Sequence, residues 1–328
     1  MNHYPPPAKH ALPSGLTELL AQLRLEDAFS APDYVWRKGN ALNAYLRASG
    51  LRAAVVAVSG GVDSALVLAL VKAASQQPGS PIQRIVPVLL PVFTDGAATN
   101  QDLATSRGVE LCGALELLPV VIDLSKAHLA TKTLVDNALS TLGEGWASGQ
   151  LVAYQRTPAL YYVTSLLTQA GTPGMLIGTT NRDEGAYLGY FGKASDGLVD
   201  AQLISDLYKS QVYEVARHLG VPSSILEATP TGDMYDGRTD EEVFGASYDA
   251  VELFLREKAC TDVARRIAAV GMADGRSDRF ASQRAALEDL HRYNHHKYLG
   301  KSPAVHFDLW DCRIEGGWDY HVAREARQ

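Results

Sequence analysis

Apolar positions along the chain follow two kinds of pattern, helical spacing and short continuous runs. Between residues 16 and 49 they recur at helical spacing, and Pro32 interrupts the series, so this segment predicts two helices. Three short apolar runs follow at 53–58, 84–90 and 117–122, with helical patterns between them. Strands that alternate with helices predict an α/β fold, a doubly wound parallel sheet flanked by helices.

The second half of the chain continues this alternation. A long helical segment at about 152–169 leads to a fourth strand candidate at 175–177, and another helix is expected at 206–219. Polar loops that contain glycine lie on either side of that helix, at 189–200 and 229–240. The remainder is predicted to be mostly helical, so helical additions are expected at both ends of the sheet domain.

The composition changes this picture little. Of 328 residues 46% are hydrophobic, and the formal charge is -7. We expect a single domain over residues 1–328, with 1–15 as an extended leader and 312–328 as an extra tail. No apolar run approaches the roughly 20 residues that cross a bilayer, and no secretory signal is recognisable, so a cytoplasmic protein without a membrane partner is expected. The acidic balance argues against nucleic acid as a partner.

Small and polar residues follow two of the predicted strands. SGGVDS, residues 59–64, leads from the first strand directly into a helix, and GTTN, residues 178–181, follows the fourth strand. In doubly wound sheets, ligands bind at the carboxyl ends of the strands. The two turns are therefore expected to face one crevice.

The chemistry of SGGVDS suits a nucleotide phosphate. Gly60 and Gly61 allow backbone conformations and a close ligand approach that a side chain would prevent, so main-chain N–H groups and the helix start can bind pyrophosphate. Ser59 and Ser64 add hydroxyl donors. Asp63 would repel a bare anion, and a Mg2+ ion that bridges phosphate oxygens explains its presence best. The alternative is that Ser59 or Asp63 only caps the helix, which explains neither the paired glycines nor the two hydroxyls.

The histidine-rich end leaves a zinc site open as an alternative, because residues four apart share one face of a helix. Spacing alone is weak evidence for a metal site, and the three cysteines of the chain form no C-x-x-C pair. The candidate zinc ligands are His291, His295, His296, His306, Asp308 and Cys312.

SGGVDS after an apolar strand resembles the pyrophosphate loop of the N-type ATP pyrophosphatases, a superfamily with an adenine nucleotide α-hydrolase-like, Rossmann-like fold. Within it, LIGTTNRDEGAYLGYFGKASDGLVDAQLISDLYKSQVYEVARHLGVP looks like the core of the NAD synthetases. PTGDM, RTDEEVFGASYDAV and HHKYLGKSPAVHFDLW follow in that family's order. The similarity covers roughly residues 20 to 311, and several motifs in one order are stronger evidence than any single motif.

The resemblance implies a site for ATP and Mg2+. In the family, the Asp of the first motif and the Glu after the GT turn bind the metal; these are Asp63 and Glu184 here. Both follow predicted strand ends, which agrees with a shared phosphate site. Glu184 has the alternative of a solvated acid in the first turn of a helix. The implied ATP contacts are Ser59, Gly60, Gly61, Val62, Asp63, Ser64, Thr179, Lys209 and Thr231.

The resemblance also implies residues for catalysis and for the second substrate. Lysines in such sites stabilise charge on the departing phosphate, although lone lysines and aspartates are more often surface residues. The implied catalytic residues are Asp63, Lys193, Asp196 and Lys209. The implied substrate-binding residues are Tyr154, Arg156, Lys193, Asp196, Asp200, His296 and Lys297.

Two departures from the family pattern concern the dinucleotide. Arg156 matches the second Arg of the family's A-R-x-R-M helix, but Tyr154 stands in place of the first, and a phenol cannot replace a bidentate guanidinium. The loop 193–198 lacks two of the family's glycines. A related acid in place of deamido-NAD therefore stays open.

The activity that the resemblance implies is the amidation of deamido-NAD to NAD, with ATP and Mg2+ as cofactors and ammonia as nitrogen donor, in a homodimer whose dinucleotide site spans the interface. Fewer than 60 residues precede SGGVDS and none is Cys, so a fused glutaminase is not expected, while a separate glutaminase stays open as a partner. Two other functions stay open as well. One is another AMP-forming adenylating enzyme of the superfamily; the other is a nucleotide-binding relative without turnover.

Overall fold

The core of the protein is a parallel β-sheet. The computed structural model describes residues 10–94, 101–232, 237–274 and 277–323. Within these residues the sheet has seven strands in the order β3-β2-β1-β4-β5-β6-β7, and every neighbouring pair is parallel. The strands are β1 (Ala53–Ala57), β2 (Arg84–Leu89), β3 (Val120–Val121), β4 (Gly174–Gly178), β5 (Ala201–Gln202), β6 (Lys301–His306) and β7 (Asp319–Val322). The predicted α/β fold is confirmed.

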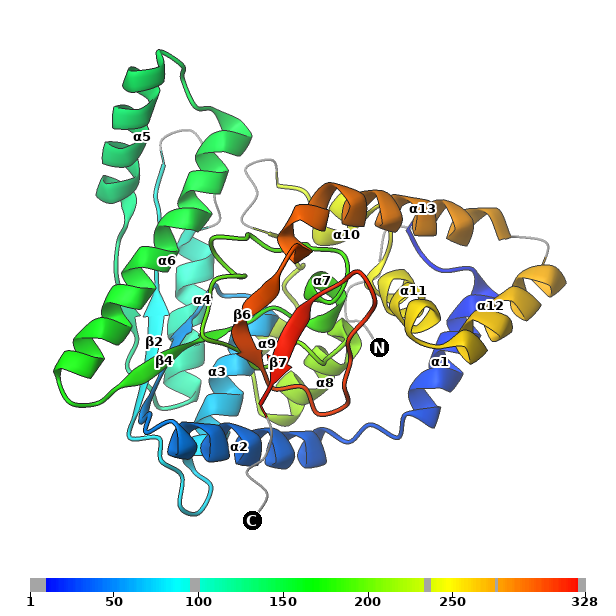
Figure 1. Cartoon of the computed structure of the whole chain (residues 1–328), viewed down its shortest axis with the longest axis horizontal. Coiled ribbons are helices and arrows are strands. Elements are labelled where there is room, and N and C mark those ends of the chain that lie inside the picture. Colours follow the sequence, from blue (N-terminus) through cyan, green and yellow to red (C-terminus); the bar gives the residue numbers. More distant parts are fainter. Residues whose placement is uncertain (1–9, 95–100, 233–236, 275–276, 324–328) are drawn as a thin grey trace.

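Helices connect the strands and cover the sheet (Figure 1). The first half contains α1 (Ser14–Glu26), α2 (Ala31–Ala48), α3 (Val62–Ser75), α4 (Gln101–Ala114), α5 (Ser125–Leu139) and α6 (Gly145–Gln169). The second half contains α7 (Arg182–Gly185), α8 (Lys209–His218), α9 (Ser223–Leu226), α10 (Asp240–Phe244), α11 (Tyr248–Ala259), α12 (Thr261–Asp274), α13 (Ser277–Asn294) and the 3-10 helix η1 (His295–Tyr298). Pro32 lies in the first turn of α2, where its missing N–H is tolerated, so the predicted break between two leading helices is confirmed.

Several element boundaries differ from the sequence-based expectations. The helix expected from residue 206 begins at Lys209, because residues 203–208 form a turn after β5. The helix expected from about residue 152 begins at Gly145, and the strand expected at 117–122 is limited to Val120–Val121. At the N-terminus, α1 begins at Ser14, inside the expected leader, of which residues 1–9 lie outside the described part.

Strands β5, β6 and β7 were not expected from the sequence. β5 is only two residues long, too short to carry a recognisable pattern. β6 alternates between exposed and buried positions, but its buried side chains are Ser302, Ala304 and His306 rather than large apolar residues. β7 places part of the expected tail, residues 319–322, at the edge of the sheet beside β6.

The two faces of the sheet are covered by different helices. Along β1 the side chains alternate, so that Ala54 and Val56 belong to the core that contains α2, α3 and α8, whereas Ala53 and Val55 belong to the core that contains α6. The strand is apolar on both sides for this reason. A sheet covered on both faces holds its strand ends in fixed positions, which is what a site at those ends requires.

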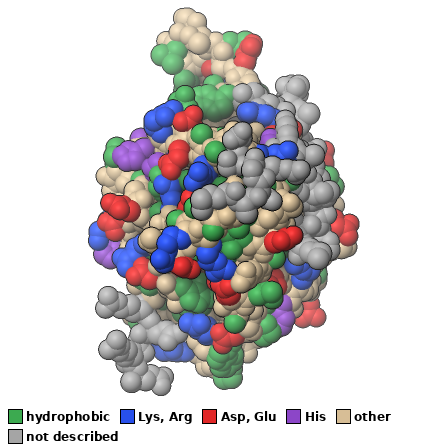
Figure 2. Space-filling view, turned by 90° about the vertical axis from the view of Figure 1, so that its right-hand side faces the viewer, with side chains coloured by type: hydrophobic (Ala, Val, Ile, Leu, Met, Phe, Trp, Pro, Cys, Tyr) green, Lys and Arg blue, Asp and Glu red, His purple; other side chains and the backbone are tan. Residues whose placement is uncertain are grey.

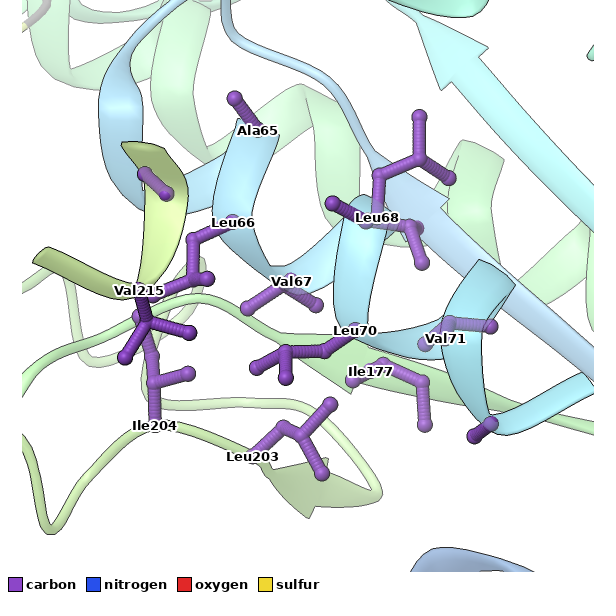
Figure 3. Packing of buried hydrophobic residues seen from close by; sticks show 14 of the residues in the cluster. Ala65, Leu66, Val67, Leu68, Leu70, Val71, Ile177, Leu203, Ile204 and Val215 are labelled. Carbon is purple, nitrogen blue, oxygen red and sulfur yellow. The ribbon is translucent and has the colours of Figure 1, made fainter. Parts of the chain in front are cut away.

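Helix α3 is the most deeply buried helix next to the sheet. It packs against β1, β2 and β4 and also against α2 and α8. Figure 3 shows Leu66 of α3 near Val215 of α8, and Leu70 of α3 near Ile177 of β4 and near Leu203. Complete burial of each such side chain stabilises the fold by about 1.5–3 kcal/mol. The N-terminus of α3, which follows SGGVDS, is therefore held firmly over the strand ends.

A second apolar core lies beside the sheet domain. It is formed by α1, α10, α11, α12 and α13, the helical additions at both ends of the chain (Figure 1). Tyr187, Leu188 and Tyr208, which flank α7 and α8, pack into the same core. The additions therefore support the two short segments that follow β4 and β5.

The surface carries charges of both signs. On the face shown in Figure 2, Lys and Arg side chains are interspersed with Asp and Glu side chains, without a continuous basic area. Among the described residues, the structure has no helix that is both long enough and apolar enough to cross a bilayer.

Candidate active site

The turn after β1 brings backbone amides and the start of α3 together. Gly60 has φ +80, and a Cβ at this position would lie 2.5 Å from the carbonyl oxygen of Ala104, so the turn requires glycine. Ser64 Oγ accepts the N–H of Ser59 at 3.1 Å and donates to the carbonyl oxygen of Gly61 at 3.0 Å. Ser64 is buried and stabilises the turn, whereas Ser59 is exposed and its hydroxyl is accessible to a ligand.

Two carboxylates from neighbouring strand ends converge on one lysine. Lys209 Nζ, at the start of α8, donates to Asp63 Oδ2 at 2.6 Å and to Glu184 Oε1 at 3.0 Å. Asn181, the N-cap residue of α7, donates from Nδ2 to Asp63 Oδ1 at 2.8 Å and accepts the N–H of Glu184 on Oδ1 at 3.0 Å. The three predicted residues thus meet where the strand order reverses between β1 and β4, the usual ligand position in such sheets.

Burial and charge shift the protonation of this cluster. Burial raises the pKa of Glu184 to about 7, against the opposing charge of Lys209. For Lys209, burial would lower the pKa, but the charges of Asp63 and Glu184 outweigh it and raise the pKa well above the ordinary value. Lys209 is only 3% exposed, so it remains a buried cation that two acids compensate.

A ring of residues that sequence reasoning missed supports Glu184. Tyr248 Oη contacts Glu184 Oε1 at 2.9 Å and Asp240 Oδ2 at 2.8 Å. Tyr190 Oη donates to Asp240 Oδ1 at 2.9 Å. Asp240 and Tyr248 lie within RTDEEVFGASYDAV, but the spacing of that segment gave no sign that their side chains reach the strand ends.

Thr231 lies beside this ring. It is exposed, and both of its neighbours are bonded to Asp240: the N–H of Gly232 donates to Oδ1 at 2.8 Å, and the carbonyl oxygen of Pro230 accepts the N–H of Asp240 at 3.1 Å. The backbone beside Thr231 is therefore connected to Glu184 through three hydrogen bonds, by way of Asp240 and Tyr248. The next residues of the PTGDM segment, 233–236, lie outside the described part.

Asp183 is a further residue that the sequence did not reveal. Its Oδ2 accepts the backbone N–H of Lys209 at 2.6 Å, while its Oδ1 has no hydrogen-bond partner among the described residues. The side chain is fully buried, and burial raises its pKa well above the ordinary value. Asp183 thus ties α7 to the first residue of α8 and fixes the backbone from which Lys209 reaches the acids.

The loop after α7 brings together four further predicted residues. Lys193 Nζ donates to the carbonyl oxygen of His296 at 3.2 Å, and Lys297 Nζ donates to that of Gly189 at 2.7 Å. Asp196 Oδ2 accepts the N–H of Gly192 at 3.1 Å, which stabilises the turn that presents the lysine. Burial lowers the pKa of Lys297 to about 8, with Asp196 acting in the opposite direction.

This loop is linked to the strand ends on both sides. Gln202 of β5 donates to the carbonyl oxygen of Asp196 at 2.8 Å and accepts the N–H of Thr180 at 3.3 Å, so it connects the loop with the turn after β4. Thr179, in that turn, is half-buried. From α6, Thr157 Oγ1 donates to the carbonyl oxygen of Ala194 at 2.8 Å. The loop is therefore held near the same edge of the sheet as Asp63 and Glu184.

Three predicted substrate residues have partners within the protein. Asp200 accepts the N–H of Leu176 at 2.8 Å and lies between β4 and β5, where it stabilises the sheet. Arg156 donates from Nε to the carbonyl oxygen of Leu90 at 3.2 Å, at the carboxyl end of β2. Tyr154 is 41% exposed and donates to Gln150, one turn earlier in α6, at 3.0 Å. Arg156 thus lies at the carboxyl-terminal edge of the sheet, where the ligand site is expected. The Tyr154 hydroxyl, in contrast, is bonded within its own helix.

The structure does not support the zinc alternative. His291 Nδ1 contacts the carbonyl oxygen of Tyr187 at 2.6 Å, and His306 lies between Ser205 and Ser302 with both ring nitrogens engaged. Asp308 accepts the N–H of Cys312 at 2.6 Å. Over the described ranges, no group of three or more His, Cys, Asp or Glu side chains is arranged to hold a metal ion.

The donor set at the strand ends nevertheless fits magnesium. Asp63 and Glu184 bind the same ammonium group, which shows that one cation can contact both. Mg2+ commonly takes one or two carboxylates and completes its shell with phosphate oxygens and water. A site for Mg2+ bound to a nucleotide therefore needs only two carboxylates from the protein, because phosphate oxygens and water provide the other ligands.

Comparisons with known proteins agree on one family. The family described as NAD synthase matches residues 34–280. An NH3-dependent NAD+ synthetase of Thermoplasma acidophilum is 34% identical over 206 residues, which are 62% of this chain and 76% of that protein. One of Alkaliphilus oremlandii is 34% identical over 224 residues, 66% of this chain and 82% of that protein. The structure of the NMN synthetase from Francisella tularensis has a TM-score of 0.61 and 25% identity, and the match covers 82% of this chain and 96% of that chain.

Proposed function

The chain belongs to the NAD synthase family, and from this premise we propose that it is a ligase that amidates deamido-NAD to NAD with ammonia, at the cost of ATP. A carboxylate is a poor electrophile, so it must first be converted to an acyl adenylate. One oxygen of the nicotinate carboxylate attacks the α-phosphorus of ATP, and the bond to pyrophosphate breaks. The nitrogen of ammonia then attacks the acyl carbon, the bond to the AMP oxygen breaks, and a proton leaves the nitrogen.

The residues at the strand ends can perform the first step by position and charge. The amides of Gly60 and Gly61 and the Ser59 hydroxyl would bind the departing pyrophosphate at the start of α3. Asp63 and Glu184 would hold Mg2+, and a bound Mg2+ would supply positive charge that offsets the negative charge of the phosphates. Lys209 would move from the two acids to the phosphate oxygens, where it stabilises the charge that develops during transfer.

The second substrate would bind at the neighbouring loop. Lys193 and Asp196 lie in the loop after α7, and Lys297 of η1 donates to the carbonyl oxygen of Gly189 in the same loop. Gln202 links this loop to the turn after β4. This arrangement supports binding of a carboxylate substrate beside β4 and β5, next to the proposed ATP site. Thr179, Thr231, Arg156, Tyr154, Asp200 and His296 remain proposed contacts of ATP or the dinucleotide.

The observation that carries the proposal is that Asp63 and Glu184 both contact the ammonium group of Lys209, at the point where the strand order reverses between β1 and β4. The test is a reaction of the purified protein with MgATP, ammonium and deamido-NAD. NAD, AMP and pyrophosphate should form in equal amounts. Release of pyrophosphate only with another acid would instead indicate a related ligase, and no release with any acid would indicate a nucleotide-binding protein without turnover.

A parallel reaction should contain nicotinate mononucleotide in place of deamido-NAD. One similar solved structure is an NMN synthetase, and Tyr154 leaves the α6 site without one of the arginines that the resemblance implies. A higher kcat/KM for the mononucleotide would reassign the substrate and leave the chemistry unchanged.

We further propose a homodimer formed through α5, α6 and β3. More than half of the large apolar side chains that are exposed in the described part of the chain lie between residues 118 and 166. Figure 1 shows α5 and α6 at one side of the molecule, beyond the sheet. An apolar area of this kind is expected to be covered by another protein surface. Its exposed members are Leu118, Val120, Val121, Leu129, Leu134, Val135, Leu139, Leu142, Trp146, Tyr154, Tyr162 and Leu166.

Two remaining features stay predictions. A cytoplasmic location and a supply of free ammonia fit an NH3-dependent activity, and a separate glutaminase stays open as an ammonia source. The supply of free ammonia is tested by an assay with glutamine in place of ammonium. A protein that uses only free ammonia should form no NAD from glutamine alone.

A further inference from the structure

The segment from Ile314 to Tyr320 lies beyond the residues that match the family, and it packs directly on α7. The N–H of Trp318 donates to the carbonyl oxygen of Ala186 at 3.2 Å. Gly317 comes so close to the same carbonyl group that a Cβ there would overlap it. The backbone of the segment thus runs against the end of α7, as the red loop beside α7 in Figure 1 indicates.

The ring of Trp318 fills the space between α7 and the loop at residues 189–200, which contains Lys193 and Asp196. Trp318 is 5% exposed, and its ring centre lies 4.7 Å from that of Phe191. On its other side it meets Gly185, where an added Cβ would collide with the indole ring. Tyr298 completes the contact, since its hydroxyl donates to the carbonyl oxygen of Gly185 at 2.8 Å.

Two neighbours of Trp318 are close in the sequence to residues of the proposed site. Gly185 directly follows Glu184, and Phe191 lies two positions before Lys193. Helix α7 has only four residues, too few to be stable without packing contacts. The orientation of Glu184 therefore depends on what packs against α7, and Trp318 supplies part of that packing.

The segment is itself anchored to the sheet. Tyr320 stacks on His306 of β6 with ring centres 3.9 Å apart, and its hydroxyl donates to Asp308 Oδ2 at 2.7 Å. His306 in turn contacts Ser205 Oγ at 2.9 Å, in the turn that leads to Lys209. A rigid anchor of this kind lets the Trp318 ring act as a fixed support rather than as a mobile cover.

From these contacts we infer that Trp318 is a positioning residue, which fixes Glu184 through Gly185 and the Lys193–Asp196 loop through Phe191. The inference rests on the proposed function, because it assigns the metal to Glu184 and the second substrate to that loop. Trp318 is nearly fully buried, and its described contacts are with other residues of the protein. Replacement of Trp318 is therefore expected to change two quantities together: the half-saturating free Mg2+ concentration and the KM for deamido-NAD.

The test compares Trp318→Ala and Trp318→Phe with Trp310→Ala. Trp310 is a control because its ring packs on Phe29 and Tyr34, at the start of α2. Wild-type activity is measured first, and its absence would overturn the proposed function rather than this inference. In an active enzyme, Trp318→Ala should raise both the half-saturating free Mg2+ concentration and the KM for deamido-NAD about ten-fold, as expected for a displaced binding group.

In Trp318→Phe a smaller ring still contacts Phe191, so the half-saturating Mg2+ concentration and the KM for deamido-NAD should both be closer to the wild-type values than in Trp318→Ala. Trp310→Ala should leave both quantities unchanged. If Trp318→Ala does not fold, the comparison of Trp318→Phe with Trp310→Ala decides, with an intermediate increase of both constants expected. Melting temperatures are recorded for all variants. A lower melting temperature with wild-type Mg2+ and deamido-NAD dependence would show that Trp318 only stabilises the fold, and it would overturn the inference.

Discussion

Lys209 donates a 2.6 Å hydrogen bond to Asp63, although 146 positions separate the two residues in the sequence. Asp63 lies in the first turn of α3 and Lys209 is the first residue of α8, and both helices pack on the same face of the sheet. The contact is therefore produced by the packing of two rigid helices. It joins the turn after β1 with the segment after β5, and the proposed reaction takes place between them.

Replacement of Lys209 should abolish most of the activity. Lys209→Met keeps the length of the side chain but removes the charge that stabilises the departing phosphate, so kcat should fall about 100- to 1,000-fold. Loss of the buried cation should also lower the free energy of unfolding by about 3 kcal/mol. Steady-state release of pyrophosphate and urea unfolding measure the two effects. Lys301→Met, at an exposed position, is the matched control, and similar kinetics of the two variants would contradict the assignment.

Asp63→Asn should abolish adenylation while the fold is retained. The amide can still accept the hydrogen bond from Asn181, but it loses the charge that Mg2+ requires. Pyrophosphate release measures the reaction, and circular dichroism measures the fold. Near-normal turnover of a folded Asp63→Asn protein would rule out the metal assignment.

The affinity for Mg2+ should depend on pH through Glu184. Burial raises the pKa of this carboxyl to about 7, so it is mostly charged at pH 8 and mostly neutral at pH 6. Only the charged form binds the metal, so the half-saturating free Mg2+ concentration should rise about ten-fold as the pH falls from 8 to 6. The measurement is the rate at fixed MgATP and varied free Mg2+.

Glu241 provides the control for this experiment, because burial also raises its pKa to about 7, while its contact is the backbone N–H of Tyr248. Glu241→Gln should retain the pH dependence, and Glu184→Gln should lose it. The same dependence in both variants would point to a different titrating group.

Gly60 should not tolerate a side chain. Gly60→Ala places a Cβ 2.5 Å from the carbonyl oxygen of Ala104 at a residue with positive φ, so the turn must shift. Gly79→Ala has a similar φ of +71 but open space around the Cβ, so it should cost only the strain of about 1–2 kcal/mol. We expect Gly60→Ala to cost about 2 kcal/mol more and to weaken ATP binding. Urea unfolding and ATP titration measure both, and equal stability of the two variants would contradict the tight turn.

The proposed homodimer predicts a specific effect of charge on α5. Leu134 is 72% exposed, and Leu134→Asp should convert a dimer to a monomer because burial of an unpaired carboxylate is costly. Leu25, on α1, is 81% exposed, and Leu25→Asp should leave the mass unchanged. Light scattering after size exclusion gives the mass. A wild-type protein that is monomeric at micromolar concentration would contradict the proposal.

Some parts of the fold are local in the sequence and were predictable from it. The apolar run before SGGVDS, the paired glycines and the apolar helix that follows define β1, the tight turn and α3 without reference to any other segment. Asp63, Glu184 and Lys209 were predictable as site residues from motifs whose order resembles the NAD synthetases. That they contact one another did not follow from the motifs, because no local pattern measures the distance between helices.

The sequence by itself determined the buried strands β1, β2 and β4 and the residue types of the site, because both depend on neighbours in the chain. Tertiary structure alone decided that Tyr248 and Asp240 reach Glu184, that Asp183 holds the backbone of Lys209, and that β7 brings Trp318 against α7. These contacts join segments that are far apart in the sequence. They arise from tertiary packing, and the physical reason is that hydrophobic burial brings distant segments together without a local sequence pattern for the contact.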